Sequence, residues 1–367
     1  MKFIIKKRIF DEAVELVSRY TDLINVSYGL RCILFEVTEE KITMKASDGF
    51  VNIIKSLDVN EEQINVVEEG SFLINASLFK NSVKKMSGDI TITDETGQIQ
   101  ISCSELKYNL APSPINIFQG FEEIYGEKKI EISTSIFKDA VKSVGFAVSN
   151  EDYTLKCINF NFHDSTIDVT ATDRYRLARY SIKTNTLFDK QFDISVLASS
   201  VKELIPAGCP EKAILFFNNT KFGIEYKNTK ITARITDVTY PKIDHLFDTT
   251  EIKHVVKIKK ETLVDLLNKA FVITIPGYKK VNLHFNKSEL KVSTIIPEIG
   301  QSLAISHEIE YEGQKNLSLD VDYNYIKDAL NVYSDEVVLL MDEKPSKILI
   351  FSKSKENAKQ ILSPTRG

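Results

Sequence analysis

The stretch Ala-Thr-Asp-Arg-Tyr-Arg-Leu-Ala, residues 171–178, decides the fold because the chain repeats its surroundings. An alternating apolar and polar pattern leads into it from Ile167, a degraded copy starts at Ile42, and a fainter one starts at Leu290. Period-two alternation is typical of a strand with one buried face. The sequence therefore predicts the same strand in three successive units.

A short strand and an amphipathic helix open each unit. The strands are predicted at residues 3–5, 130–132 and 255–258. In each helix the pattern occupies positions i, i+1, i+4, i+5 and i+8, starting at Ile9, Ile136 and Thr262. The matched residues Phe10, Phe137 and Leu263 are 127 and 126 residues apart, so the register holds along the chain.

A second helix follows later in each unit, at residues 76–86, 197–204 and 323–330. Pro114 and Pro241 precede the two unit boundaries and are again 127 residues apart. The 367 residues are enough for three domains of about 120 residues, each able to bury its own core. We predict domains at 1–127, 128–253 and 254–367.

Composition excludes several classes of protein. The net charge of −4 and the 43% hydrophobic content are ordinary for a globular chain, and no apolar run approaches the roughly 20 residues of a membrane span. The first residues lack a signal-peptide pattern, so we expect a cytoplasmic protein with no membrane partner. Four widely spaced cysteines without C-x-x-C spacing predict neither a metal site nor a redox pair.

Motifs for catalysis are missing from the sequence. No two of the 14 glycines are closer than six residues, which excludes the G-x-G-x-x-G and G-x-x-x-x-G-K phosphate loops. The five histidines form no metal-binding pair, and no G-x-S-x-G motif occurs. We predict no catalytic residue, no metal and no cofactor.

The pattern predicts an α+β fold in which each unit is a sheet layer with two helices packed on one side. Lysines recur on the polar helix faces, namely Lys80, Lys84, Lys85, Lys138, Lys142, Lys202 and Lys269. If the helices line one concavity, it is locally basic in an acidic protein. The alternative is that these are ordinary solvated lysines.

Three sheet-containing units in a row leave an unpaired strand edge at each end. Two chains joined head to tail would cover both edges and give a ring of six units. Candidate contact residues are Tyr108 and Leu110 late in the first unit, and Val272 and Ile273 in the third. Internal core positions are the alternative reading of these four residues.

The three units, the T-D-x-x-R-L-A stretch and the closing residues 361–367 are similar to the bacterial DNA polymerase III beta subunit, the sliding clamp. The resemblance spans the whole chain. It implies a non-catalytic homodimeric ring of six domains, with helices inside and sheets outside. Such a ring encircles double-stranded DNA without reading its sequence and tethers the polymerase catalytic subunit; a clamp-loader complex and other proteins with clamp-binding motifs are further partners.

In this family, partner peptides insert apolar residues into a pocket between the second and third domains. The matching residues here are Leu155, Thr172, Arg174, Tyr175, Arg176, Leu177, Pro241, Leu246, Tyr323, Ser346, Leu362, Pro364 and Arg366. The leucines suit an apolar floor, and Arg176, Arg366 and Tyr323 suit polar orientation of a peptide. From the residues alone, the favoured interpretation is that Thr172 and Asp173 end a strand in a turn.

The sequence departs from the family at several positions. Arg174 stands where relatives often have a small residue, and Ser363 and Thr365 stand where bulkier apolar residues are common. A loop arginine is absent from residues 22–25, whereas Tyr153 keeps an aromatic residue of a DNA-facing loop. The peptide preference and the DNA contact of the first loop are therefore open.

Two other functions compete with the clamp. A dispersed active site would need paired carboxylates with perturbed pKa values in a cleft. A repeat scaffold that binds peptides without DNA would be indifferent to loss of the helix lysines.

Overall fold

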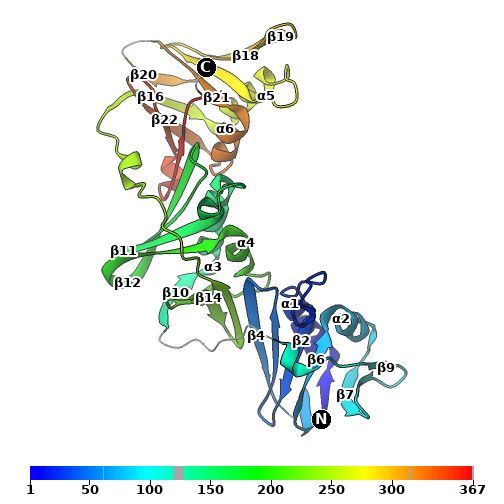
Figure 1. Cartoon of the computed structure of the whole chain (residues 1–367). Helices are drawn as coiled ribbons and strands as arrows, with labels where there is room; N and C mark the ends of the chain where they lie inside the picture. Colours follow the sequence, from blue (N-terminus) through cyan, green and yellow to red (C-terminus); the bar gives the residue numbers. More distant parts are fainter. Residues whose placement is uncertain (61, 119–126, 314–315, 366–367) are drawn as a thin grey trace. The chain divides into compact units, whose positions relative to one another are not determined.

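The computed structural model describes residues 1–60, 62–118, 127–313 and 316–365 (Figure 1). In these residues the strands are joined by antiparallel pairing into four sheets, with six α-helices. Close packing divides the chain into two compact units, Met1–Thr134 with Ser199–Ile235, and Ser135–Ala198 with Thr236–Gly367. The predicted α+β class with antiparallel sheets is confirmed.

The first unit holds two sheets. The five-stranded sheet runs in the order β5 (Ile64–Glu68), β1 (Lys2–Lys6), β7 (Asp89–Glu95), β8 (Gln98–Ser102) and β9 (Lys107–Leu110). The eight-stranded sheet runs in the order β10 (Lys128–Ser133), β13 (Lys212–Phe217), β14 (Lys221–Tyr226), β15 (Thr229–Arg234), β4 (Val51–Asp58), β3 (Lys41–Ser47), β2 (Cys32–Val37) and β6 (Gly70–Asn75).

Phenylalanines fill the core beneath the helices of the first unit. Helices α1 (Lys7–Ser18) and α2 (Ala76–Lys85) lie side by side (Figure 1). Phe10 of α1 and Phe79 of α2 meet edge to face at 5.8 Å, and Phe35 stacks on Phe72 at 4.5 Å. All four rings are buried, so each contributes roughly 1.5–3 kcal/mol through loss of apolar surface from water. This unit also holds 3₁₀ turns at Tyr28–Arg31 and Ile115–Ile117, and most of α4 (Ala198–Glu203).

The second unit also holds two sheets. The seven-stranded sheet runs in the order β11 (Cys157–Thr172), β12 (Arg176–Leu197), β24 (Ala358–Leu362), β23 (Ile348–Phe351), β22 (Glu336–Asp342), β16 (Ile252–Lys259) and β20 (Glu310–Glu312). The four-stranded sheet runs in the order β19 (Gly300–Ser306), β18 (Leu290–Ile296), β17 (Lys280–Phe285) and β21 (Leu317–Asp322).

Three α-helices pack in the second unit. They are α3 (Thr134–Val144), which begins at the unit boundary, α5 (Lys260–Ala270) and α6 (Tyr323–Leu330). Helices α5 and α6 lie side by side, and Asp322 caps α6 by accepting from the N–H groups of Asn324 and Tyr325 (Figure 1). Short 3₁₀ turns occur at Gly145–Ala147, Thr154–Lys156, Asp244–Phe247 and Lys353–Lys355.

The predicted repeat is visible in the core. Phe35, Phe160 and Phe285, spaced by 125 residues, occupy the same strand of each repeat and are almost fully buried. In the first helix of each repeat the last four positions of the apolar pattern are buried, but the first is not: Ile136 is 43% exposed. That position lies at the edge of the apolar arc, so it faces partly toward solvent.

Two of the sheets extend across the predicted domain boundaries. Strand β15 of the middle repeat pairs with β4 of the first, and β24 of the last repeat pairs with β12 of the middle one. Each repeat therefore contributes to two sheets rather than forming a single sheet layer. The boundaries near residues 127 and 253 stay predictions. No helix in the described part of the chain is long and apolar enough to cross a membrane.

Candidate functional site

Residues 171–178 form the turn of the long β11–β12 hairpin. Strand β11 ends at Thr172, which pairs across the ladder with Leu177. The Thr172 hydroxyl donates to the carbonyl of Arg176 at 2.7 Å and accepts from the N–H of Arg174 at 3.2 Å. The reading of Thr172 and Asp173 as the end of a strand is confirmed. Residues 173–175 connect the two strands at this end of the seven-stranded sheet.

Asp173 organises the turn and orients Arg176. Its carboxylate accepts from the N–H groups of Tyr175 and Arg176 at 3.0 and 2.9 Å, and from Nε of Arg176 at 2.8 Å. The same guanidinium donates to Asp328 of α6 at 2.6 Å and lies 4.4 Å from the ring centre of Tyr325. Arg176 is therefore fixed between two carboxylates and an aromatic face.

Arg174 occupies the tip of the turn in a strained conformation. Its φ is +80°, in the left-handed region that favours glycine. Its guanidinium pairs with Asp152, whose other oxygen accepts from the N–H groups of Thr154 and Leu155. Desolvation is the largest single effect on Asp152 and raises the pKa of its carboxyl, but the donors Arg174, Leu155 and Thr154 together outweigh it and hold that pKa below the ordinary value.

An apolar cluster lies next to the turn on the seven-stranded sheet. Leu177, Leu349 and Ile361 are at most 5% exposed, and half-buried side chains pack against them from Ile243, Leu246, Phe247 and Leu340. We refer to these seven residues as the Leu177 cluster. Arg179 holds the linker, residues 235–251 between β15 and β16, in place, because its guanidinium pairs with Asp244 and lies 4.1 Å from the ring centre of Phe247.

The other predicted pocket residues differ in their placement. Leu362 pairs with Arg176 across the β12–β24 ladder, and Leu155 is buried beside Asp152. Tyr323 instead stacks on Phe271 at 3.9 Å and donates to Asn268. Pro241 and Ser346 are exposed, Pro364 is half-buried, and Arg366 lies outside the described residues.

Sequence reasoning missed much of this surface. It did not identify Arg179, Ile243, Phe247, Tyr325, Asp328, Leu340, Leu349 and Ile361. The apolar pair at the end of β24 was the available signal, since Ile361 directly precedes Leu362. The linker residues carry no local pattern that marks them as part of a site.

The first repeat contains a copy of the same turn. Asp48 accepts from the N–H groups of Phe50 and Val51 at 2.8 and 2.7 Å, and Gly49 donates to Ser47 at 3.0 Å. Phe50 is 61% exposed and its counterpart Tyr175 is 62% exposed. The backbone N–H of Arg234 donates to the carbonyl of Phe50, and the backbone N–H of Ser363 donates to the carbonyl of Tyr175. Both turns are therefore bonded in the same way to a segment from later in the chain.

The helix lysines fall into two groups. Lys84, Lys85, Lys138, Lys142 and Lys202 are exposed and have no ion pair within the described residues. Lys80 pairs with Glu15 at 3.5 Å, and Lys269 pairs with Asp265 at 2.6 Å. Tyr153 is 59% exposed. Within the described residues no group of His, Cys, Asp and Glu has the arrangement of a metal site.

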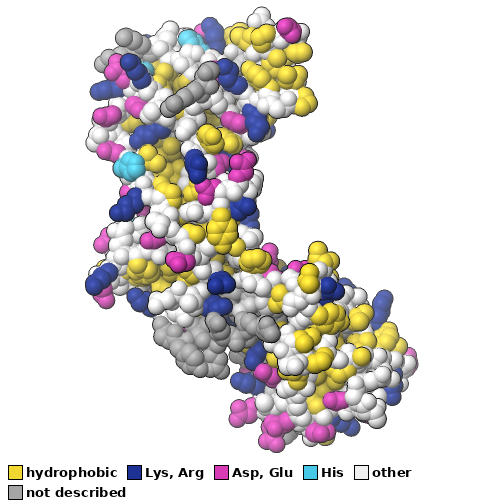
Figure 2. Space-filling model, in the orientation of Figure 1, with side chains coloured by type: hydrophobic (Ala, Val, Ile, Leu, Met, Phe, Trp, Pro, Cys, Tyr) yellow, Lys and Arg dark blue, Asp and Glu magenta, His cyan; other side chains and the backbone are white. Residues whose placement is uncertain are grey.

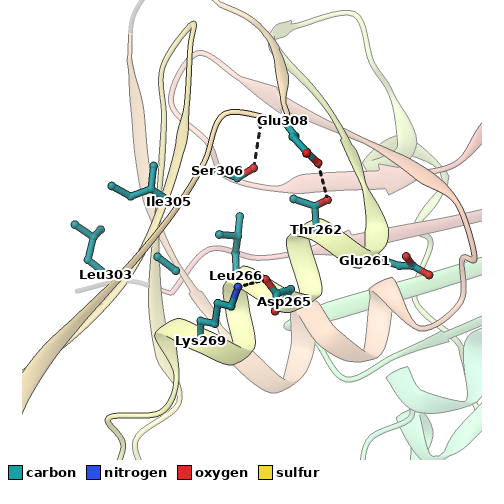
Figure 3. A pocket seen from close by; sticks show the side chains of 10 residues that line it. Glu261, Thr262, Asp265, Leu266, Lys269, Leu303, Ile305, Ser306 and Glu308 are labelled. Atoms are coloured by element: carbon teal, nitrogen blue, oxygen red, sulfur yellow. Dashed lines mark hydrogen bonds and ion pairs between the residues drawn. The ribbon is translucent and has the colours of Figure 1, made fainter.

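Strands β9 and β19 each lie at the end of their sheet. Tyr108 and Leu110 of β9 are half-buried, Val272 is 76% exposed, and Ile273 lies against Gly300 at the start of β19. Figure 2 shows hydrophobic side chains gathered over this part of the second unit, where Leu303 and Ile305 are exposed. They line a hollow of about 510 Å³ with α5, whose Asp265–Lys269 ion pair is drawn in Figure 3.

Comparison with known proteins agrees with this architecture. The family model of the DNA polymerase III beta subunit N-terminal domain matches residues 1–118, and that of its central domain matches residues 131–242, together more than half of the chain. The chain belongs to the DNA polymerase III beta subunit family, the beta sliding clamps. This family is the processivity subunit of the polymerase and is non-catalytic.

Relatives of this family align along the whole chain. The beta sliding clamp of Mycoplasmopsis pulmonis is 25% identical over 375 residues, covering 100% of both chains. That of Staphylococcus aureus is 23% identical and covers 100% of this chain and 99% of its own. The Bacillus subtilis sliding clamp structure superposes with a TM-score of 0.92 at 22% identity, covering 100% and 99%, which shows that the three-repeat clamp fold is shared.

Proposed function

We propose that this protein is a DNA sliding clamp: two copies close head to tail into a ring around duplex DNA and tether a DNA polymerase. The observation that carries the proposal is the way successive repeats are joined. At each junction the last strand of one repeat pairs with the edge strand of the preceding repeat. These pairs are β15 with β4 and β24 with β12. A ring requires one more junction of this kind.

The remaining junction has both of its halves available. Strand β9 is the counterpart of β15 and β24, and β19 is the counterpart of β4 and β12, and both end their sheets. A second copy of the chain supplies the missing partner for each edge, antiparallel as in the two internal junctions. The apolar side chains of Leu303 and Ile305, with Val272 and Ile273, would then be covered on association.

Sequence-independent DNA binding is supported by the exposed lysines on α2, α3 and α4 that have no ion pair in the described part of the chain. An ammonium group attracts phosphate without reading a base, and a closed ring is held topologically, so weak contacts permit sliding. We propose Lys84, Lys85, Lys138, Lys142 and Lys202 as the main contacts, with Tyr153 as a further contact. Lys80 and Lys269 are already paired and contribute less.

Partner binding is proposed at the Leu177 cluster. Its apolar floor and the fixed guanidinium of Arg176 suit a short peptide with apolar residues, which the polymerase catalytic subunit, a clamp loader and other clamp-binding proteins would each present. The predicted location of the protein is the cytoplasm, at the nucleoid.

The central experiment measures assembly and DNA retention together. Retention after loading should persist on closed circular DNA and be lost on linear DNA with free ends. The Leu303→Glu, Ile305→Glu double variant should sediment as a monomer, because unpaired charges at a buried contact cost about 3 kcal/mol or more. Leu187→Glu is the single-charge control, since Leu187 is 74% exposed on β12 and belongs to neither β9 nor β19. Equal retention on both DNA forms, or a wild-type monomer at micromolar concentration, would refute the proposal.

The lysine contacts are tested by salt dependence. Replacing Lys84, Lys138, Lys142 and Lys202 with Gln should reduce the slope of log affinity against log salt by about 0.9 for each phosphate that is no longer neutralised. Four exposed lysines outside the helices, at positions 41, 190, 287 and 344, provide the charge-matched control. An equal effect of both sets would mean that general charge, and not the helix faces, attracts DNA.

A further inference from the structure

The two copies of the hairpin turn differ at their most constrained position. Gly49 in the first repeat has φ +96°, and its counterpart Arg174 has φ +80°. The backbone N–H groups of the two turns donate equivalent hydrogen bonds, so glycine at this position is compatible with the turn. A residue with a Cβ is strained in this left-handed region, whereas glycine is not. The chain therefore carries an arginine where its own first repeat shows that glycine is sufficient.

The ion pair of Arg174 does little to offset that cost. Its side chain is 73% exposed and that of Asp152 is 29% exposed. Solvent-exposed pairs of this kind contribute little to stability. Asp152 is also held independently, because it accepts from the N–H groups of Thr154 and Leu155. If Arg174 leaves Asp152 and pairs with another carboxylate, the stability of the fold therefore changes little.

Among the three arginines of the hairpin, Arg174 has the most accessible side chain. The guanidinium of Arg176 lies between Asp173 and Asp328, and that of Arg179 is paired with Asp244, with both side chains at most 15% exposed. Arg174 has five N–H donors and directs one of them to Asp152 within the described residues. Its neighbours along the turn lead directly to Leu177 in the apolar cluster.

We propose that Arg174 recognises a carboxylate of the partner peptide whose apolar residues occupy the Leu177 cluster. This inference rests on the proposed function and adds a second requirement to it: the peptide carries an acidic group beside its apolar residues. A planar guanidinium accepts a carboxylate through two parallel hydrogen bonds, which an amide cannot reproduce. The carboxylate comes either from an Asp or Glu side chain or from the end of the partner chain.

The test measures peptide affinity by fluorescence polarisation with the full-length protein. The probes are labelled hexapeptides with two adjacent leucines and either Asp or Asn placed in turn at each remaining position, with an amidated end. A second set without Asp has a free or an amidated carboxyl end, which separates the two sources. We expect one position, or the free end, to bind about 5-fold more tightly than its neutral counterpart, which corresponds to about 1 kcal/mol.

Variants distinguish recognition from a purely structural role. In Arg174→Gly the preference for the acidic probe should fall to about 1-fold, while thermal unfolding stays as in wild type or rises. Asp152→Asn keeps an oxygen for the N–H groups of Thr154 and Leu155 but frees Arg174, so it should strengthen the acidic preference. If Asp152→Asn abolishes the preference as Arg174→Gly does, Arg174 is a tether and the proposal is overturned.

The outcomes also separate this inference from the function on which it rests. Binding of the leucine probes with no acidic preference at any position overturns the role of Arg174 but leaves the peptide site intact. No binding of any probe overturns the proposed peptide site itself, and the role of Arg174 with it.

Discussion

Replacing Asp173 with Ala should destabilise the second unit by roughly 2–4 kcal/mol. The carboxylate satisfies two backbone N–H groups and the Nε of Arg176. Side chains of the pair are 11% and 13% exposed, so the contact is close to a buried ion pair, for which loss of one partner costs about 3–5 kcal/mol. Asp328 still neutralises Arg176, and the turn N–H groups gain access to water, so we expect roughly 2–4 kcal/mol, a cost shifted below that range.

The first repeat supplies an internal control for this prediction. Asp48→Ala removes the equivalent two backbone hydrogen bonds, but the residue that corresponds to Arg176 is Val51, so no ion pair is broken. We expect about 1–2 kcal/mol for that change. The two free-energy changes are measured by urea denaturation followed by tyrosine fluorescence. Hydrogen exchange shows in which unit each change occurs. A cost for Asp48→Ala equal to that for Asp173→Ala would show that the Arg176 contact contributes nothing.

Two further changes probe the pH response and the core. Desolvation of His163 is outweighed by its contacts with Asp164 and Asp168, so its pKa is raised in the folded state. That contribution to stability is fully present below the unfolded pKa of about 6.5 and is lost as pH rises through the higher folded value. The stability difference between wild type and His163→Gln should therefore shrink by up to about 1 kcal/mol between pH 5.5 and pH 8. Thermal unfolding at the two pH values measures this change. Phe160→Ala should cost about 3–5 kcal/mol in urea denaturation, because Phe160 is fully buried and stacks on Phe137; a loss below 1 kcal/mol would contradict the assigned core.

Local patterns in the sequence determine much of the fold. The repeat predicts the second helix of the last unit at residues 323–330, as observed, and the structure shows that Asp322 caps it. The pairing of β15 with β4 was not predicted. Those strands are more than 170 residues apart, and neither alternation nor turn residues specify which edge a strand will join.

The candidate site was predictable in part for the same reason. Arg176 and Leu177 lie in the T-D-x-x-R-L-A stretch, which resembles the family motif. Resemblance to the family also predicts Leu246 as a pocket residue. Asp328, which holds Arg176, comes from a helix 152 positions away and resembles any exposed acidic residue in the sequence. Contacts of this kind depend on tertiary packing, which single-residue patterns do not encode.

The edge strands β9 and β19 have a consequence for how the assembly would respond to dilution. Inside one chain, covalent connection keeps the partner strands at a high effective concentration, so the two internal junctions form at any protein concentration. The junction between two copies has no such linkage, so its occupancy depends on protein concentration. A cell could therefore open the assembly at one type of joint alone, and a substitution there would alter lifetime on DNA while leaving each subunit folded.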